Sequence, residues 1–110
     1  MIKVFISQPM RGLFRDEIRK NREKIIDFIK KQHEDQDIEI IDNIFDIYLN
    51  NDDITNKALL CLGKSLIEMS KADVCYFTSN YKEFRGCKIE YQAAMDYGIP
   101  AFIINDDVLV

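Results

Sequence analysis

The N-terminal segment of the chain, residues 2–12, reads IKVFISQPMRG. Its first half is a short run of β-branched and aromatic residues, which is typical of a buried strand. The run stops at Ser7, Gln8 and Pro9, as a strand that ends in a loop should. The segment therefore predicts a strand at Ile2–Ile6 that leads into a polar loop.

Helices and strands are predicted to alternate along the rest of the chain. Apolar residues recur at helical spacing after the first loop and predict a long amphipathic helix from Arg15 to Gln32. The next segments are predicted as a strand at Asp37–Ile41, a loop or short helix at Asn43–Ile54, and a helix that Thr55 caps and that reaches Ser70. A strand at Val74–Phe77 and a polar loop at Thr78–Arg85 follow. The chain then continues with a helix over Gly86–Tyr97, which Gly98 ends in a left-handed conformation, and a strand at Ala101–Ile104.

This order of elements predicts an α/β fold. Parallel strands need crossover connections, so strands that alternate with helices indicate a sheet covered on both faces. We expect a single flavodoxin-like or Rossmann-like three-layer domain over residues 1–110, with a mostly parallel sheet of four to five strands. A hydrophobic fraction of 47% is high enough for a real core and excludes intrinsic disorder.

The composition also limits the possible locations and ligands. The longest apolar run, residues 99–104, is far shorter than the roughly 20 residues of a membrane-spanning helix. The first residues lack the pattern of a signal peptide, so we expect a cytoplasmic protein without a membrane partner. Three cysteines and one histidine, without a paired-cysteine motif, favour neither a disulfide framework nor a metal site, and no cofactor is expected.

Charge is distributed unevenly along the chain. Residues 1–31 contain nine bases and four acids, whereas residues 32–56 contain eight acids and no base. Two solvated faces of opposite sign and an electrostatic partner site are both compatible with this pattern. The net charge of −4 disfavours binding to duplex nucleic acid.

Ligands of open α/β sheets bind beyond the carboxyl ends of the strands, and two predicted loops lie there. The first loop offers the Ser7 hydroxyl, the Arg11 guanidinium and the amides of a helix start, which suit a small anion. It matches neither a dinucleotide-binding fingerprint nor a P-loop, so a tight turn without a ligand is the alternative.

The second loop leads into a helix with Glu90 in about its first turn, where the helix dipole favours the ionised carboxylate. An ionised acid in a crevice could attack or stabilise an electron-poor sugar carbon. The alternative is a surface acid that only stabilises the helix. Cys87 is either a thiol with a lowered pKa, next to Arg85 and Lys88, or a small buried residue.

Several motifs together resemble one superfamily. They are VFISQPMRG at residues 4–12, SKADV at 70–74, RGCKIEY at 85–91 and GIP at 98–100. In this order they resemble the nucleoside 2-deoxyribosyltransferase superfamily over nearly the whole chain. The similarity is greatest to short bacterial and phage members whose first loop reads Ser-Gly-Pro-Met-Arg-Gly; here Gln8 replaces the glycine.

The resemblance implies cleavage of the N-glycosidic bond of deoxynucleosides or their monophosphates. Glu90 matches the nucleophile that attacks the anomeric carbon, and the first loop matches the segment around the sugar or 5′-phosphate. A homo-oligomer is also expected, because the superfamily commonly builds its pocket at subunit contacts and residues 108–110 are apolar. The predicted substrate-binding residues are Ser7, Gln8, Pro9, Met10, Arg11, Gly12, Gly86, Cys87 and Lys88.

Two acids of the superfamily are absent from this sequence. Ser65 occupies the position of an aspartate eight residues before Asp73, and Phe84 that of an acid six residues before Glu90. Loss of a general acid typically lowers a rate by about 10²- to 10⁴-fold, so we expect slow or absent turnover with measurable ligand affinity. Three functions remain open: a deoxyribosyltransferase or N-glycosidase, a nucleotide sensor or sequestering protein, and an interaction protein without a ligand.

Overall fold

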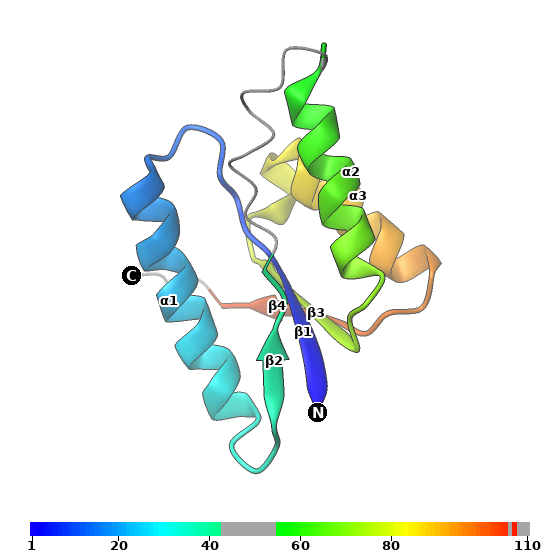
Figure 1. The fold of residues 1–110 in the computed structure, drawn as a ribbon. Helices are drawn as coiled ribbons and strands as arrows, with labels where there is room; N and C mark the ends of the chain where they lie inside the picture. The colour runs from blue at the N-terminus through cyan, green and yellow to red at the C-terminus, as the bar shows by residue number, and fades with distance from the viewer. Residues whose placement is uncertain (43–54, 106, 108–110) are drawn as a thin grey trace.

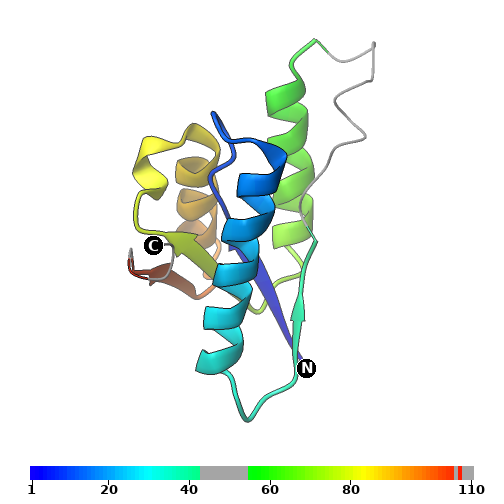
Figure 2. The same cartoon turned by 90° about the vertical axis from the view of Figure 1, so that its left-hand side faces the viewer.

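The computed structural model describes residues 1–42, 55–105 and 107, which form three layers with the sheet in the middle. Helix α1 covers one face of the sheet, and α2 and α3 cover the other (Figures 1 and 2). The elements are β1 (Ile2–Ser7), α1 (Arg15–Gln32), β2 (Ile38–Ile40), α2 (Lys57–Met69), β3 (Val74–Thr78), the short 3-10 helix η2 (Tyr81–Glu83), α3 (Arg85–Asp96) and β4 (Ala101–Ile104).

The described strands form one parallel sheet in the order β2-β1-β3-β4. This confirms the predicted α/β fold as a single flavodoxin-like or Rossmann-like domain. The chain leaves β1 toward β2 on one side and later returns to β3 on the other, so the strand order reverses between β1 and β3. Ser7 pairs with Phe77 in register, which brings the carboxyl ends of the two strands together at the point where such folds bind ligands.

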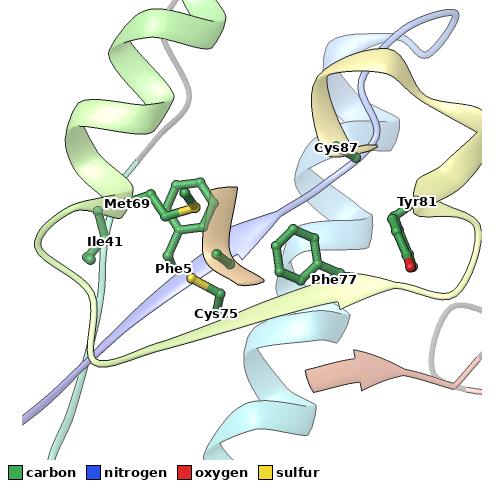
Figure 3. Close-up of a cluster of buried hydrophobic side chains, with 8 residues drawn as sticks. Phe5, Ile41, Met69, Cys75, Phe77, Tyr81 and Cys87 are labelled. Carbon is green, nitrogen blue, oxygen red and sulfur yellow. The ribbon is translucent and has the colours of Figure 1, made fainter. Parts of the chain in front are cut away.

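Side chains of successive strand residues alternate between two hydrophobic cores. The core on the α1 face is mostly aliphatic and contains Val4, Ile6, Ile25, Ile29, Tyr76 and Ile104. The core on the α2 and α3 face is rich in aromatic and sulfur-containing residues (Figure 3). It contains Phe5, Ile41, Met69, Cys75, Phe77, Tyr81, Cys87 and Ala94.

Most predicted boundaries agree with the structure to within one or two residues, but the cap of α2 was assigned wrongly. Asn56, and not Thr55, caps this helix, because the Asn56 side chain accepts a hydrogen bond of 2.9 Å from the backbone N–H of Leu59. Gly98 has a φ of 74°, which confirms the left-handed position predicted after α3.

The segment between β3 and α3 is more ordered than the predicted polar loop. It contains η2, and Tyr81 is buried there with its ring centroid 4.4 Å from that of Tyr91. An aromatic ring in this position gains more from packing than from solvation. The prediction for Asn43–Ile54 and the apolar residues 108–110 lie outside the described residues. Within those described, no helix has the length and apolar character needed to cross a membrane.

A candidate ligand site around Glu90

Glu90 is the centre of a buried polar cluster built by β1, α2 and α3. Its side chain points from the second turn of α3 toward the sheet and is only 6% exposed. The Ser7 hydroxyl donates a hydrogen bond of 2.9 Å to Oε1, and the Ser65 hydroxyl donates one of 2.5 Å to Oε2. The interpretation of Glu90 as a surface acid is therefore wrong, and the two loops predicted to share a crevice do meet.

Burial changes the expected pKa of Glu90. Desolvation raises the pKa of this carboxyl group above its ordinary value, while the hydrogen bonds from Ser65 and Ser7 oppose the rise. The sequence led us to expect that the helix dipole favours ionisation, but burial acts in the opposite direction and has the larger effect. The dipole acts mainly within the first turn, whereas Glu90 lies in the second, where loss of water is the larger effect.

A cavity of about 300 Å³ opens above Glu90. Its residues come from the first loop, from α2 and from the beginning of α3. They are Gln8, Pro9, Met10, Arg11, Ala58, Cys61, Leu62, Ser65, Phe84, Arg85, Gly86, Cys87 and Glu90. Glu90 is the one carboxylic acid among these lining residues, and Arg11 and Arg85 are the two cations. The cavity thus combines apolar walls, a buried acid and two exposed guanidinium groups.

Arg11 connects the first loop to the beginning of α3. Its guanidinium donates a hydrogen bond of 3.3 Å to the Glu83 carbonyl oxygen and lies over the Phe84 ring, 5.6 Å from the centroid. Phe84 occupies the position at which the sequence analysis expected an acid. Its ring makes a cation–π contact with the guanidinium, whereas a carboxylate there would neutralise the positive charge. Arg11 is exposed and keeps further N–H groups for an anion.

The structure brings most of the predicted site residues together. Seven of the predicted substrate-binding residues line the cavity or bond to Glu90: Ser7, Gln8, Pro9, Met10, Arg11, Gly86 and Cys87. Gly12 and Lys88 are not among the cavity-lining residues. Gly12 has a φ of 80° and so makes the turn that leads toward α1, and Lys88 is exposed on α3.

The cysteines of the site differ in accessibility. Cys87 is buried, and burial raises the pKa of its thiol to about 11, so the interpretation of Cys87 as an activated thiol is wrong. Cys61 is partly exposed and lines the cavity. Within the described residues, no three His, Cys, Asp or Glu side chains are grouped to hold a metal ion.

Six of the cavity-lining residues were not among the predicted site residues: Ala58, Cys61, Leu62, Ser65, Phe84 and Arg85. For Ser65 a signal existed in the sequence analysis, where the expected superfamily pattern has an aspartate at this position. Cys61 carried no such signal, since the register of α2 against α3 depends on tertiary packing. Comparison with known proteins gives no relative: no family model, curated protein or solved structure matches the chain.

Proposed function

We propose that the cavity above Glu90 binds a nucleoside or nucleotide and that turnover there is slow or absent. The observation that supports this most strongly is the buried Glu90 carboxyl group, which Ser7 and Ser65 hold in a fixed orientation next to an open cavity. Each carboxyl oxygen retains a second lone-pair site, which can accept a hydrogen bond from a sugar hydroxyl.

The cations favour a ligand with an anionic end. Arg11 and Arg85 both line the cavity, and planar guanidinium groups suit a phosphate. The backbone amides at the start of α3 add a partial positive charge, and Phe84, the residue before the helix, provides no side-chain hydrogen bond to them. A nucleoside monophosphate would place its phosphate here and its sugar over Glu90.

Binding without fast turnover follows from the shortage of acids. Most glycosidic cleavage uses two carboxyl groups, and Glu90 is the one carboxylic acid among the cavity-lining residues. Burial raises the pKa of this carboxyl group, which lowers the ionised fraction that can act as a nucleophile. Ser65 is a hydroxyl that donates to Glu90, so it does not replace the missing general acid.

N-glycosidic cleavage or deoxyribosyl transfer by Glu90 is the second candidate function. The contact between Glu90 and the first loop favours it, because the resemblance assigns the nucleophile and the sugar-binding segment to these two places. An enzyme of this kind would release a free base from a deoxynucleoside or its monophosphate.

Alkylation of Cys61 tests binding, because any ligand that fills the cavity should shield this thiol from the reagent. We would treat the protein with iodoacetamide in the presence of deoxynucleoside monophosphates and cyclic nucleotides, and measure the rate at Cys61 by peptide mass spectrometry. We expect at least one nucleotide to slow the reaction, and expect Arg11→Ala to weaken this protection. Lys88→Ala is the control, since it removes a cation of α3 outside the cavity.

The same mixtures separate the alternatives. Chromatography should find base release near background, and robust multiple turnover that Glu90→Gln abolishes would establish the enzyme instead. If no nucleotide protects Cys61 and none is cleaved, both nucleotide functions fail, and the interaction protein without a ligand remains.

We also propose a homo-oligomer in which a second copy of this chain covers the outer face of α2 and α3. Three large apolar side chains are exposed there: Leu59 at 63%, Ile67 at 53% and Ile89 at 40%. Large apolar side chains exposed on neighbouring helices are often covered by a partner. Light scattering at micromolar concentration should give a multiple of 12.9 kDa, and a monomer mass would contradict the proposal.

A further inference from the structure

The two outer strands of the sheet, β2 and β4, differ in how they protect their lateral edges (Figure 1). β2 is short, and its central residue Glu39 is exposed, as is Asp37 just before the strand. Charged side chains of this kind keep an edge strand from pairing with another chain. β4 has no such protection, because residues 97–105 contain no charged side chain. In the described part of the chain β4 pairs with β3 alone, so its lateral edge is open to a further strand.

The backbone groups along the lateral edge of β4 have a fixed order. The carbonyl oxygen of Pro100 accepts a hydrogen bond of 2.8 Å from the backbone N–H of Cys75, so it points toward β3. Successive peptide groups of a strand alternate in direction. The N–H and C=O groups of Ala101 and Ile103 therefore point away from β3, and those of Phe102 point toward it. The lateral edge thus presents two donors and two acceptors.

These groups are complementary to a second copy of themselves. In an antiparallel pair of β4 strands with a twofold axis at Phe102, Ala101 of each copy faces Ile103 of the other. Residues that face each other in this way exchange two N–H···O hydrogen bonds, so every outward group of both copies finds a partner. A shift of one residue would place outward groups opposite inward ones. Because Ile103 faces the small Ala101, backbone groups carry this part of the contact.

Phe102 is the apolar contact at the centre of this arrangement. Its ring packs against that of Tyr76, with centroids 5.5 Å apart, yet the residue remains 49% exposed. The Tyr76 hydroxyl lies 3.0 Å from Nε2 of His33, which holds the supporting ring in place. On the axis, Phe102 faces its own copy in a pair without mutual backbone bonds, where the Cα atoms are only about 4.5 Å apart. The two aromatic side chains then cover each other.

We propose that two copies of this chain pair their β4 strands in antiparallel orientation and so join their sheets into one. A second copy suits this edge because neither strand carries a charge that would repel the other. A pair of such short strands buries less than the roughly 1,200 Å² of a stable interface, so we expect a dissociation constant on the order of micromolar. The surface is separate from the outer face of α2 and α3, and the inference goes beyond the function proposed above.

Disulfide cross-linking tests the register of the pair. In a Cys61→Ser background, which removes the partly exposed thiol, Phe102→Cys should form a disulfide-linked dimer under a mild oxidant. Ile103→Cys is the matched control, because its two copies lie out of register, beyond the roughly 7 Å of Cα separation that a disulfide spans. We expect cross-linking of this control to be about tenfold slower. Equal rates for the two variants would overturn the proposal.

Hydrogen exchange of the wild-type protein decides the case in which Phe102→Cys fails to fold or to cross-link. We expect the N–H groups of Ala101 and Ile103 to become protected as the protein concentration rises through the micromolar range. Those of Phe102 and Ile104 point toward β3 and should exchange slowly at every concentration. Outward N–H groups that stay unprotected at the highest concentration would refute the pairing.

The mass of the protein in solution separates the remaining outcomes. Protection of the outward N–H groups in a monomer of 12.9 kDa would also refute the pairing, since a segment of the same chain would then cover the edge. Ile67→Lys places a charge on the outer face of α2 instead and should leave both the protection and the cross-link unchanged. The pairing of β4 and the oligomer proposed for the α2 and α3 face therefore fail separately.

Discussion

The two faces of the sheet bury polar side chains in different ways. On the α2 and α3 face, each oxygen of Glu90 accepts a hydrogen bond from a serine, so residues of the chain itself supply a donor to each oxygen of the acid. Toward α1, Gln8 uses its N–H and leaves its oxygen without a partner among the described residues. The difference teaches that packing of the chain can satisfy a buried acid completely, whereas it leaves one oxygen of a buried amide unsatisfied.

The largest expected effect concerns the aliphatic core of the α1 face. Ile29 is fully buried, so Ile29→Ala should lower the free energy of unfolding by about 2–5 kcal/mol through lost burial and the cavity that remains. Ile103→Ala on β4 is the matched control, because that side chain is 44% exposed. Urea unfolding measures both. Similar losses in the two variants would contradict the core described for this face.

A smaller effect on stability should follow from the loss of one hydrogen bond to Glu90. Ser65→Ala leaves Oε2 without its donor, so we expect the free energy of unfolding to fall by about 1–3 kcal/mol and the pKa of Glu90 to rise further. Ser70→Ala is the control on the same helix, since the Ser70 hydroxyl donates to a backbone carbonyl at an exposed helix end. Indistinguishable losses would show that the contact between Ser65 and Glu90 adds no stability.

The protonation of Glu90 should make stability depend on pH. Burial raises its pKa in the folded state, so its stabilising contribution is present below the ordinary pKa of a glutamic acid and is lost as the pH rises through the folded value. Glu90→Gln cannot ionise and can still bond to both serines. We therefore expect the variant to gain stability relative to wild type as the pH rises above about 4.3, the ordinary pKa of glutamic acid. A difference that stays constant, or that favours wild type at high pH, would contradict the raised pKa.

Thiol reactivity should distinguish the cysteine of the open cavity from those of the core, and this prediction involves no change in stability. Burial raises the pKa of Cys75 to about 12 and that of Cys87 to about 11, and both residues are at most 5% exposed. We expect alkylation near neutral pH to modify Cys61 alone. Labelling of Cys87 at a comparable rate would mean that the beginning of α3 opens readily.

The sequence predicted the fold well because its signals are local. The apolar period of Arg15–Gln32 and the run at Ala101–Ile104 were predicted with the observed bounds, and the conformation of Gly98 follows from its place after a helix. The proximity of Ser7 and Glu90 was predictable as well. The carboxyl ends of parallel strands lie at one edge of the sheet, and Ser7 and Glu90 both belong to segments that follow such ends.

The details of the site were harder to predict, because they depend on contacts between distant segments. Carboxylates are mostly exposed, so the burial of Glu90 and the direction of its pKa shift emerge only once α2 lies beside α3. The contact of Ser65 with Glu90 has the same origin. Likewise, the sequence placed Gln8 in the first loop, but the carbonyl oxygen that orients its amide belongs to Ile18, a helix residue.

The contact between Ser7 and Glu90 joins residues 83 positions apart. A molecule that rests on both is therefore held by two segments that meet only when β1 and β3 are paired, and the unfolded chain offers it no binding surface. Binding and global folding are then linked: a ligand at about 100 times its dissociation constant adds about 2.7 kcal/mol to the free energy of unfolding. The melting temperature of the whole protein becomes a direct measure of occupancy, which allows large compound collections to be searched for the natural ligand.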